Sequence, residues 1–268
     1  MKNQTLIAID LFSGAGGLSE GLQAAGFNIL AASEINPIYA ETYRANHLST
    51  KLYEGDIRLL DAKKIRRDLR LKMCELDLLA GGPPCQGFSI NAPIRSFHDR
   101  RNHLFFEYLK FIDVFKPKIV LIENVPGLIS AANGFAVKSI YKSFSDLKYK
   151  IHHMILYAAH YGVPQMRWRT VFLASRNDIV LPSFPLPTHH ANGIANFTGG
   201  KQLCFKTSKS KDLFNGDLLW YVTVKDAISD LPALANGEGC EEMAYIFPPK
   251  SDYQKEARKH SEVIWNHR

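Results

Sequence analysis

The sequence has no long apolar run and little cysteine. No stretch approaches the roughly eighteen apolar residues that a membrane-spanning helix needs. The opening residues lead straight into a strand-like run, without the apolar stretch and cleavage site of a secretory signal. The four cysteines, Cys74, Cys85, Cys204 and Cys240, include no CxxC pair of the kind found in zinc and redox sites. These absences predict a cytoplasmic protein with reduced cysteines, no metal and no membrane partner.

Charged residues are neither scarce nor dominant, at 22% of the 268 residues, and 46% are hydrophobic, as in globular proteins. Lys and Arg number 33 against 26 Asp and Glu, which leaves a formal net charge of +7. A positive excess favours a polyanionic partner, because neutralising phosphates releases counterions. A basic protein without such a partner fits the composition equally well. The length suffices for one large α/β domain with a small appendage.

Short apolar runs alternate with helix-like segments through the first 175 residues. Strands are expected at 6–12, 28–33, 75–80, 118–122, 149–157 and 169–175. Helices are expected at 18–26, 37–46, 103–115 and 135–147. This alternation predicts an α/β fold with a doubly wound, mostly parallel, Rossmann-like sheet covered by helices on both faces. Ligands of such sheets bind at the carboxyl ends of the strands.

The regular pattern stops after residue 175. Residues 176–222 are rich in Pro, Gly, Asn, His and Lys, which predicts a long irregular segment, disordered in part. A short helix is expected at 223–230, and 251–268 is polar and helix-like with no strand to pack on. We therefore predict a cofactor-binding and catalytic domain over 1–175 and an irregular extension over 176–268.

The first candidate site is the glycine-rich turn from Asp10 to Gly17, DLFSGAGG, between a strand and a helix. Glu34 ends the next strand, where a carboxylate can accept both hydroxyls of a ribose. The glycines miss the G-x-G-x-x-G spacing that suits a dinucleotide, so the turn predicts another nucleoside cofactor. An ordinary strand–helix turn is the alternative. Asp56 follows a third strand-like stretch, where it could hold an adenine amino group or simply cap a helix.

Three further motifs follow strand-like runs. Cys85 lies in GGPPCQGFS, where two prolines restrict the backbone, as suits a positioned nucleophile. A structural cysteine would more often lie within an apolar run. Glu123, in ENV, ends the run KIVLI and is expected to point into the ligand crevice, unless it caps the next helix. Arg167 and Arg169, in QMRWR, lie on one side of an extended segment and could contact phosphate, a carbonyl oxygen or only solvent.

The order FxGxGG, PCQ, ENV, QxRxR resembles that of the DNA cytosine-5 methyltransferases, which have the class I methyltransferase fold. Other segments resemble the family in the same order: 99–106 (DRRNHLFF), 160–169 (HYGVPQMRWR), 184–189 (FPLPTH) and 223–232 (TVKDAISDLP). The resemblance is strong over 6–175 and looser over 182–232. It implies DNA (cytosine-5-)-methyltransferase activity (EC 2.1.1.37) on double-stranded DNA, as in restriction–modification systems. The implied cofactor is S-adenosyl-L-methionine, with S-adenosyl-L-homocysteine as product.

The resemblance also assigns roles to individual residues. Positions that hold the cofactor are matched by Phe12, Gly14, Gly16, Gly17, Glu34, Ile35, Asp56, Ile57, Pro84 and Leu104. Cys85 matches the nucleophile that adds to C6 of a flipped-out cytosine, so that C5 can attack the sulfonium methyl. Glu123 matches the acid at the ring nitrogen and Arg169 a contact to the base carbonyl. Arg167 completes the last motif, and with Gln165 is expected to support its loop.

The sequence departs from the family at its end. Members continue into a target-recognition domain and two more motifs, and this chain ends at Arg268. We favour one subunit of a split methyltransferase, completed by a second polypeptide, because every catalytic position is intact. A truncated enzyme or gene remnant and a non-catalytic S-adenosylmethionine-binding regulator are the alternatives. An NAD-dependent oxidoreductase would leave the Cys, Glu and Arg motifs unexplained.

Overall fold

The computed structural model describes residues 5–84, 103–190, 218–259 and 263–265. The chain forms two compact units. The first contains Met1–Ile155 and Arg169–Phe184, and the second contains Leu156–Trp168 and Pro185–Arg268. The predicted boundary at residue 175 remains a prediction.

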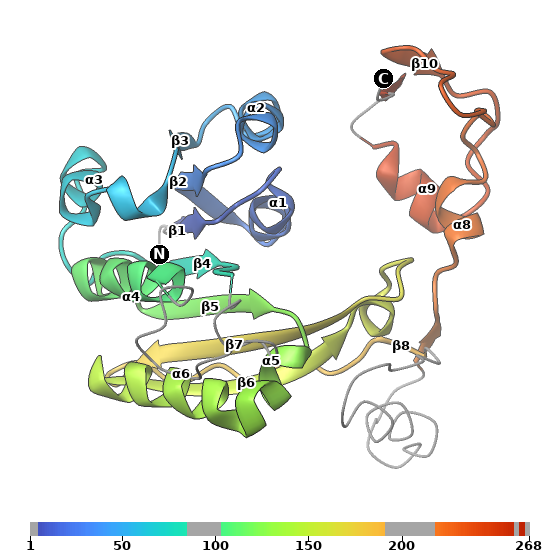
Figure 1. Ribbon diagram of the computed structural model, residues 1–268. Coiled ribbons are helices and arrows are strands. Elements are labelled where there is room, and N and C mark those ends of the chain that lie inside the picture. Colours follow the sequence, from blue (N-terminus) through green and yellow to red (C-terminus); the bar gives the residue numbers. More distant parts are fainter. Residues whose placement is uncertain (1–4, 85–102, 191–217, 260–262, 266–268) are drawn as a thin grey trace. The chain divides into compact units, whose positions relative to one another are not determined.

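The first unit is built on a seven-stranded sheet with strand order β3-β2-β1-β4-β5-β7-β6 (Figure 1). Its strands are β1 (Leu6–Leu11), β2 (Phe27–Glu34), β3 (Lys51–Glu54), β4 (Leu78–Gly81), β5 (Ile119–Asn124), β6 (Tyr149–Tyr157) and β7 (Trp168–Arg176). Strands β1 to β5 pair in parallel, whereas β7 runs antiparallel to β5. The predicted mostly parallel, doubly wound α/β sheet is therefore confirmed.

Helices cover both faces of this sheet. They are α1 (Gly17–Ala24), α2 (Pro37–Asn46), η1 (Ile57–Leu59), α3 (Ala62–Asp68), α4 (His103–Phe115), α5 (Gly127–Ser130), η4 (Ala131–Gly134) and α6 (Phe135–Asp146). Because side chains alternate along a strand, Ile9 and Leu11 join the main core with α3, α4 and α6. Ala8 packs on the opposite face, against Leu22 of α1. As predicted, α2 starts with Pro37 in its first turn, and the Asn36 side chain caps it.

The second unit holds shorter elements. They are η5 (Ala158–Tyr161), β8 (His189–His190), β9 (Leu219–Trp220), α8 (Val224–Ile228), β10 (Glu242–Ala244), α9 (Asp252–Ala257) and β11 (Val263–Trp265). Capping boxes begin both α8, at Thr223, and α9, at Ser251. The Arg258 guanidinium lies 3.7 Å from the centre of the Tyr245 ring and pairs with the buried Asp230.

One expectation for this region is confirmed and another needs correction. The helix expected at 223–230 is confirmed as α8, but 251–268 is not uniformly helical. Helix α9 ends at Ala257, and the β-prone residues of β11 pair antiparallel with β10, a strand that the sequence analysis did not foresee. Within 176–222, β8 pairs in parallel with β9, while 191–217 lie outside the described residues. None of the helices in the described parts has the length and apolar character needed to cross a bilayer.

Candidate functional site

The glycine-rich turn follows β1 and faces the end of β2. The Gly14 N–H donates to Oε2 of Glu34 at 2.8 Å, and the Asn36 N–H donates to Oε1 at 2.8 Å. The Glu34 side chain is thereby fixed at the carboxyl end of its strand, 8% exposed. Each carboxylate oxygen has a second lone pair, which leaves capacity for two ligand hydroxyls.

The backbone of this turn takes conformations that most side chains avoid. Phe12, although not a glycine, has φ 59°, and Gly14 and Gly16 have φ 57° and 101°. A Cβ at Gly16 would lie 2.2 Å from Nε2 of His47, so only glycine fits there. Phe12 packs partly buried against the main core. Gly17 begins α1 directly behind the turn.

Asp56 caps a helix, as one of its two predicted readings proposed. Its side chain accepts the Arg58 N–H at 2.9 Å and caps η1. Arg58 Nε also donates to both carboxylate oxygens, at 2.9 and 2.8 Å. These hydrogen bonds from the Arg58 side chain lower the pKa of Asp56, so the carboxylate stays ionised.

The remaining predicted cofactor residues differ in exposure. Ile35 is 63% exposed next to Glu34, where its side chain is accessible to a ligand ring. Ile57 is 4% exposed within the main core, which leaves its backbone as the part that a ligand can reach. Leu104 packs partly buried against the same core, and Pro84 is exposed.

A second cluster lies where β4 and β5 end. Arg169 Nε, at the start of β7, donates to Oε1 of Glu123 at 2.5 Å. The Asn124 amide donates to the Pro83 carbonyl at 3.0 Å, which ties the end of the described segment before residue 85 to the ENV segment. β4 lies so close to β1 at Gly81 that only glycine fits there, because a Cβ would lie 2.4 Å from the Leu11 carbonyl oxygen. Glu123 does not cap α5, whose N-cap is Pro126 without a side-chain bond.

The two motif arginines belong to different units, and Arg169 is the one in the same unit as Glu123. Arg167 belongs to the second unit, where its side chain is exposed and its carbonyl accepts the Ala158 N–H at 2.9 Å. The Trp168 ring between them stacks on Tyr157 with centroids 4.2 Å apart. The sequence analysis did not predict this stacking, although the Trp in QMRWR indicated a buried aromatic residue. Gln165 is exposed in the same loop.

Cys85 lies outside the described residues, which resume at His103. The described chain nevertheless reaches Pro84, one residue before it. Pro83, two residues before Cys85, is the one that Asn124 holds. No cluster of His, Cys, Asp or Glu suited to a metal ion occurs among the residues that the structure describes.

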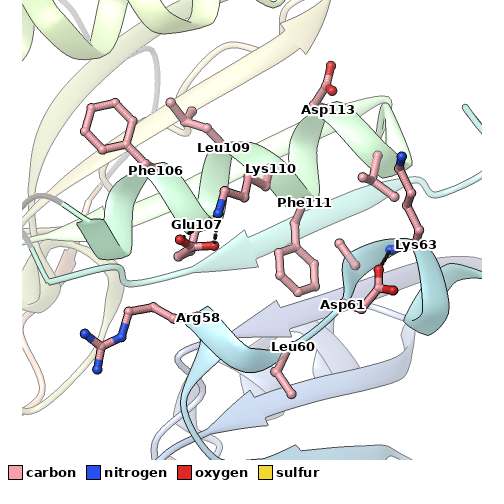
Figure 2. Close-up of a pocket in the computed structure, with 12 residues that line it drawn as sticks. Arg58, Leu60, Asp61, Lys63, Phe106, Glu107, Leu109, Lys110, Phe111 and Asp113 are labelled. Carbon is pink, nitrogen blue, oxygen red and sulfur yellow. Dashed lines mark hydrogen bonds and ion pairs between the residues drawn. The ribbon is translucent and has the colours of Figure 1, made fainter.

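A pocket of about 580 Å³ lies between η1, α3 and α4 (Figure 2). Phe106, Leu109 and Leu60 contribute apolar surface, and Lys110 pairs with Glu107 at 2.8 Å. Arg58, the partner of Asp56, also lines it. Sequence analysis gave no signal for this pocket, because its lining comes from three separate elements.

The profile of the C-5 cytosine-specific DNA methylases matches residues 6–260. The chain belongs to this family. Members of the C-5 cytosine-specific DNA methylase family use S-adenosylmethionine, and the seven-stranded sheet is typical of class I methyltransferases.

Several relatives are type II methyltransferases. M.AgeI of Thalassovita gelatinovora is 37% identical over 263 residues, which cover 97% of this chain and 59% of M.AgeI. M.AquIA of a Picosynechococcus strain is 36% identical over 232 residues, covering 84% of this chain and 88% of M.AquIA. A putative DNA modification methyltransferase encoded within a prophage of E. coli has a TM-score of 0.69 and 26% identity, covering 97% of this chain and 70% of that one. The chain thus spans under two thirds of M.AgeI but most of M.AquIA.

Proposed function

We propose that this chain carries the cofactor-binding and catalytic part of a DNA cytosine-5 methyltransferase, with Cys85 as the nucleophile. The observation that carries the proposal is the hydrogen bond from Asn124 to the Pro83 carbonyl. It holds the segment leading to Cys85 beside the Glu123–Arg169 pair. Addition to cytosine requires a nucleophile, an acid and a cation, and these are the roles proposed for Cys85, Glu123 and Arg169.

The glycine-rich turn and Glu34 fit S-adenosylmethionine. Backbone close to the ligand and a fixed strand-end carboxylate suit a nucleoside with free ribose hydroxyls. Ile35 offers an exposed apolar side chain next to Glu34 for the adenine face, and Asp56 offers an ionised carboxylate for the adenine amino group. When bound, the cofactor supplies an electrophilic sulfonium methyl group.

The other residues act on the cytosine. The Cys85 thiolate forms a bond to C6, which places electron density on C5. Glu123 contacts N3 and stabilises the charge that develops in the ring, and Arg169 orients Glu123 and contacts the base carbonyl. After the methyl group is transferred to C5, a base removes the C5 proton and Cys85 leaves. The target base must leave the DNA stack to reach these groups.

We also propose that a second polypeptide supplies DNA recognition. The match covers 88% of the length of M.AquIA, a type II methyltransferase, which supports a methyltransferase chain of about this length. A non-catalytic S-adenosylmethionine-binding regulator is the alternative. It would keep the Glu34 site but have no use for the Glu123–Arg169 pair.

Covalent trapping tests the proposal. Because a base must remove the C5 proton before Cys85 can leave, duplex DNA containing 5-fluorocytosine should hold the enzyme as a covalent adduct. We expect an adduct on a denaturing gel that requires S-adenosylmethionine, any complementing chain and Cys85, with Cys240→Ser as the matched control. A Cys85→Ser variant that still transfers methyl groups at the normal rate would overturn the assignment of the nucleophile.

A further inference from the structure

A buried polar relay lies behind the glycine-rich turn and joins three elements of the first unit. The Ser19 hydroxyl of α1 donates to Oδ2 of Asp10 in β1 at 2.7 Å. The same hydroxyl is 2.8 Å from the Tyr43 hydroxyl of α2. All three side chains have no exposed surface, so none of them can contact a ligand.

A second contact supports the turn from the same side. His47, which follows α2, places its ring against Gly16, where no side chain would fit. Its Nδ1 lies 2.8 Å from Oε1 of Gln23 in α1, and its ring lies 4.4 Å from that of Tyr43. The turn therefore rests on α2 through His47 and on α1 through Ser19.

The relay is costly for the fold. Burial raises the pKa of Asp10 to about 6, and its Oδ1 has no hydrogen-bond partner among the described residues. A buried carboxylate with an unsatisfied oxygen destabilises a folded protein compared with a well-packed apolar residue. Helix α1 has no side-chain N-cap of its own, since its N-cap residue is Gly16. The Asp10 carboxylate, in β1, instead accepts the Ser19 N–H and so satisfies a free N–H in the first turn of α1.

We propose that Asp10, Ser19 and Tyr43, together with His47 and Gln23, are positioning residues that hold the glycine-rich turn in its cofactor-binding conformation. They act through Gly14 and Gly16 rather than on the cofactor. The inference rests on the proposed function, because it takes this turn to be the cofactor site. It adds to that function a group of residues that sets cofactor affinity from outside the site.

Two tyrosine variants test the inference. Tyr43→Phe removes the relay hydroxyl, and Tyr149→Phe removes a buried hydroxyl that donates to the Pro117 carbonyl at 2.7 Å. Pro117 lies just before the amino end of β5, whereas the glycine-rich turn follows the carboxyl end of β1, so the control is far from the turn. Calorimetric titration with S-adenosylhomocysteine should show affinity about three- to tenfold weaker in Tyr43→Phe, the effect of one net hydrogen bond. Tyr149→Phe should lose thermal stability but keep the affinity of the unchanged chain.

A milder variant covers the case in which Tyr43→Phe does not fold. Gln23 is only partly buried, so Gln23→Ala should fold while freeing the His47 ring under Gly16. We expect about a two- to threefold loss of affinity. Unchanged affinity in the folded variants, or an equal loss in Tyr149→Phe, would overturn the inference and leave the proposed function intact. Failure of the unchanged chain to bind S-adenosylhomocysteine would instead count against the cofactor site itself.

Discussion

Arg169 Nε lies 2.5 Å from Oε1 of Glu123, and the two residues belong to strands that run in opposite directions. Because β7 is antiparallel to β5, the start of β7 lies beside the end of β5, where Asn124 pairs with Thr170. An arginine at the beginning of one strand thus reaches a glutamate at the end of its neighbour.

The first prediction concerns this pair. In the presence of any complementing polypeptide, Glu123→Gln should lower the single-turnover rate of methyl transfer by about 10²-fold or more, because the amide cannot supply a proton or a full charge at N3. The affinity for S-adenosylmethionine should stay the same. Asp178→Asn makes the same chemical change beyond the other end of β7, where Asp178 pairs with Arg176, and should leave the rate unchanged. Equal rates in the two variants would contradict the role of Glu123.

The second prediction concerns Glu34. Glu34→Ala should weaken cofactor binding by about 1.5–3 kcal/mol, because charge-assisted hydrogen bonds to the ribose and to the turn are lost. Glu41→Ala, an exposed carboxylate on α2, is the matched control and should have no effect. Calorimetry measures both. Unaltered affinity in Glu34→Ala would show that this carboxylate does not hold the cofactor.

The third prediction is a pH dependence of stability. Burial raises the pKa of Asp10 from 3.8 to about 6, so the folded state binds this proton more tightly than the unfolded state. The free energy of unfolding should therefore fall as pH rises from about 4 to 6 and level off above. Asp10→Asn removes this dependence. The stability of the variant relative to the unchanged chain should rise over this range by up to about 3 kcal/mol.

Urea denaturation at several pH values between 4 and 7.5 measures this difference. Because other groups titrate alike in both proteins, they cancel in the comparison. Two stability curves that run parallel across the range would show that Asp10 does not titrate there.

The fourth prediction concerns DNA. With a formal net charge of +7, these 268 residues by themselves should bind duplex DNA weakly and lose more than about tenfold in affinity between 50 and 200 mM salt. Fluorescence anisotropy measures this loss. Methylation of a defined sequence should begin only when a complementing polypeptide is added. A purified single chain that methylates one sequence would refute the need for a partner.

Much of the first unit could be predicted from apolar runs and their spacing. The runs at 118–122 and 149–157 correspond closely to β5 and β6, because β-branched and aromatic residues recur along both segments. The direction of β7 could not be predicted, since side chains alternate with the same period in parallel and antiparallel strands. The sequence analysis therefore named Arg169 and Glu123 separately, without their contact.

The relay behind the turn was also beyond prediction. Asp10, Ser19 and Tyr43 come from a strand and two helices, and no spacing within the sequence links a hydroxyl on α1 with one on α2. The role of Arg167 stays a prediction, since Arg167 belongs to the second unit and Arg169 to the first.

The antiparallel course of β7 has a practical consequence for labelling this protein. Arg169 is the second residue of β7, and Arg176, the last, lies seven residues or roughly 23 Å further along the strand. A turn follows, in which the Ile179 N–H donates to the Arg176 carbonyl. This turn therefore lies at the opposite end of β7 from Arg169. Asn177 and Asp178 in this turn are exposed. A fluorophore or a short peptide tag placed there would therefore lie away from the Glu123–Arg169 pair.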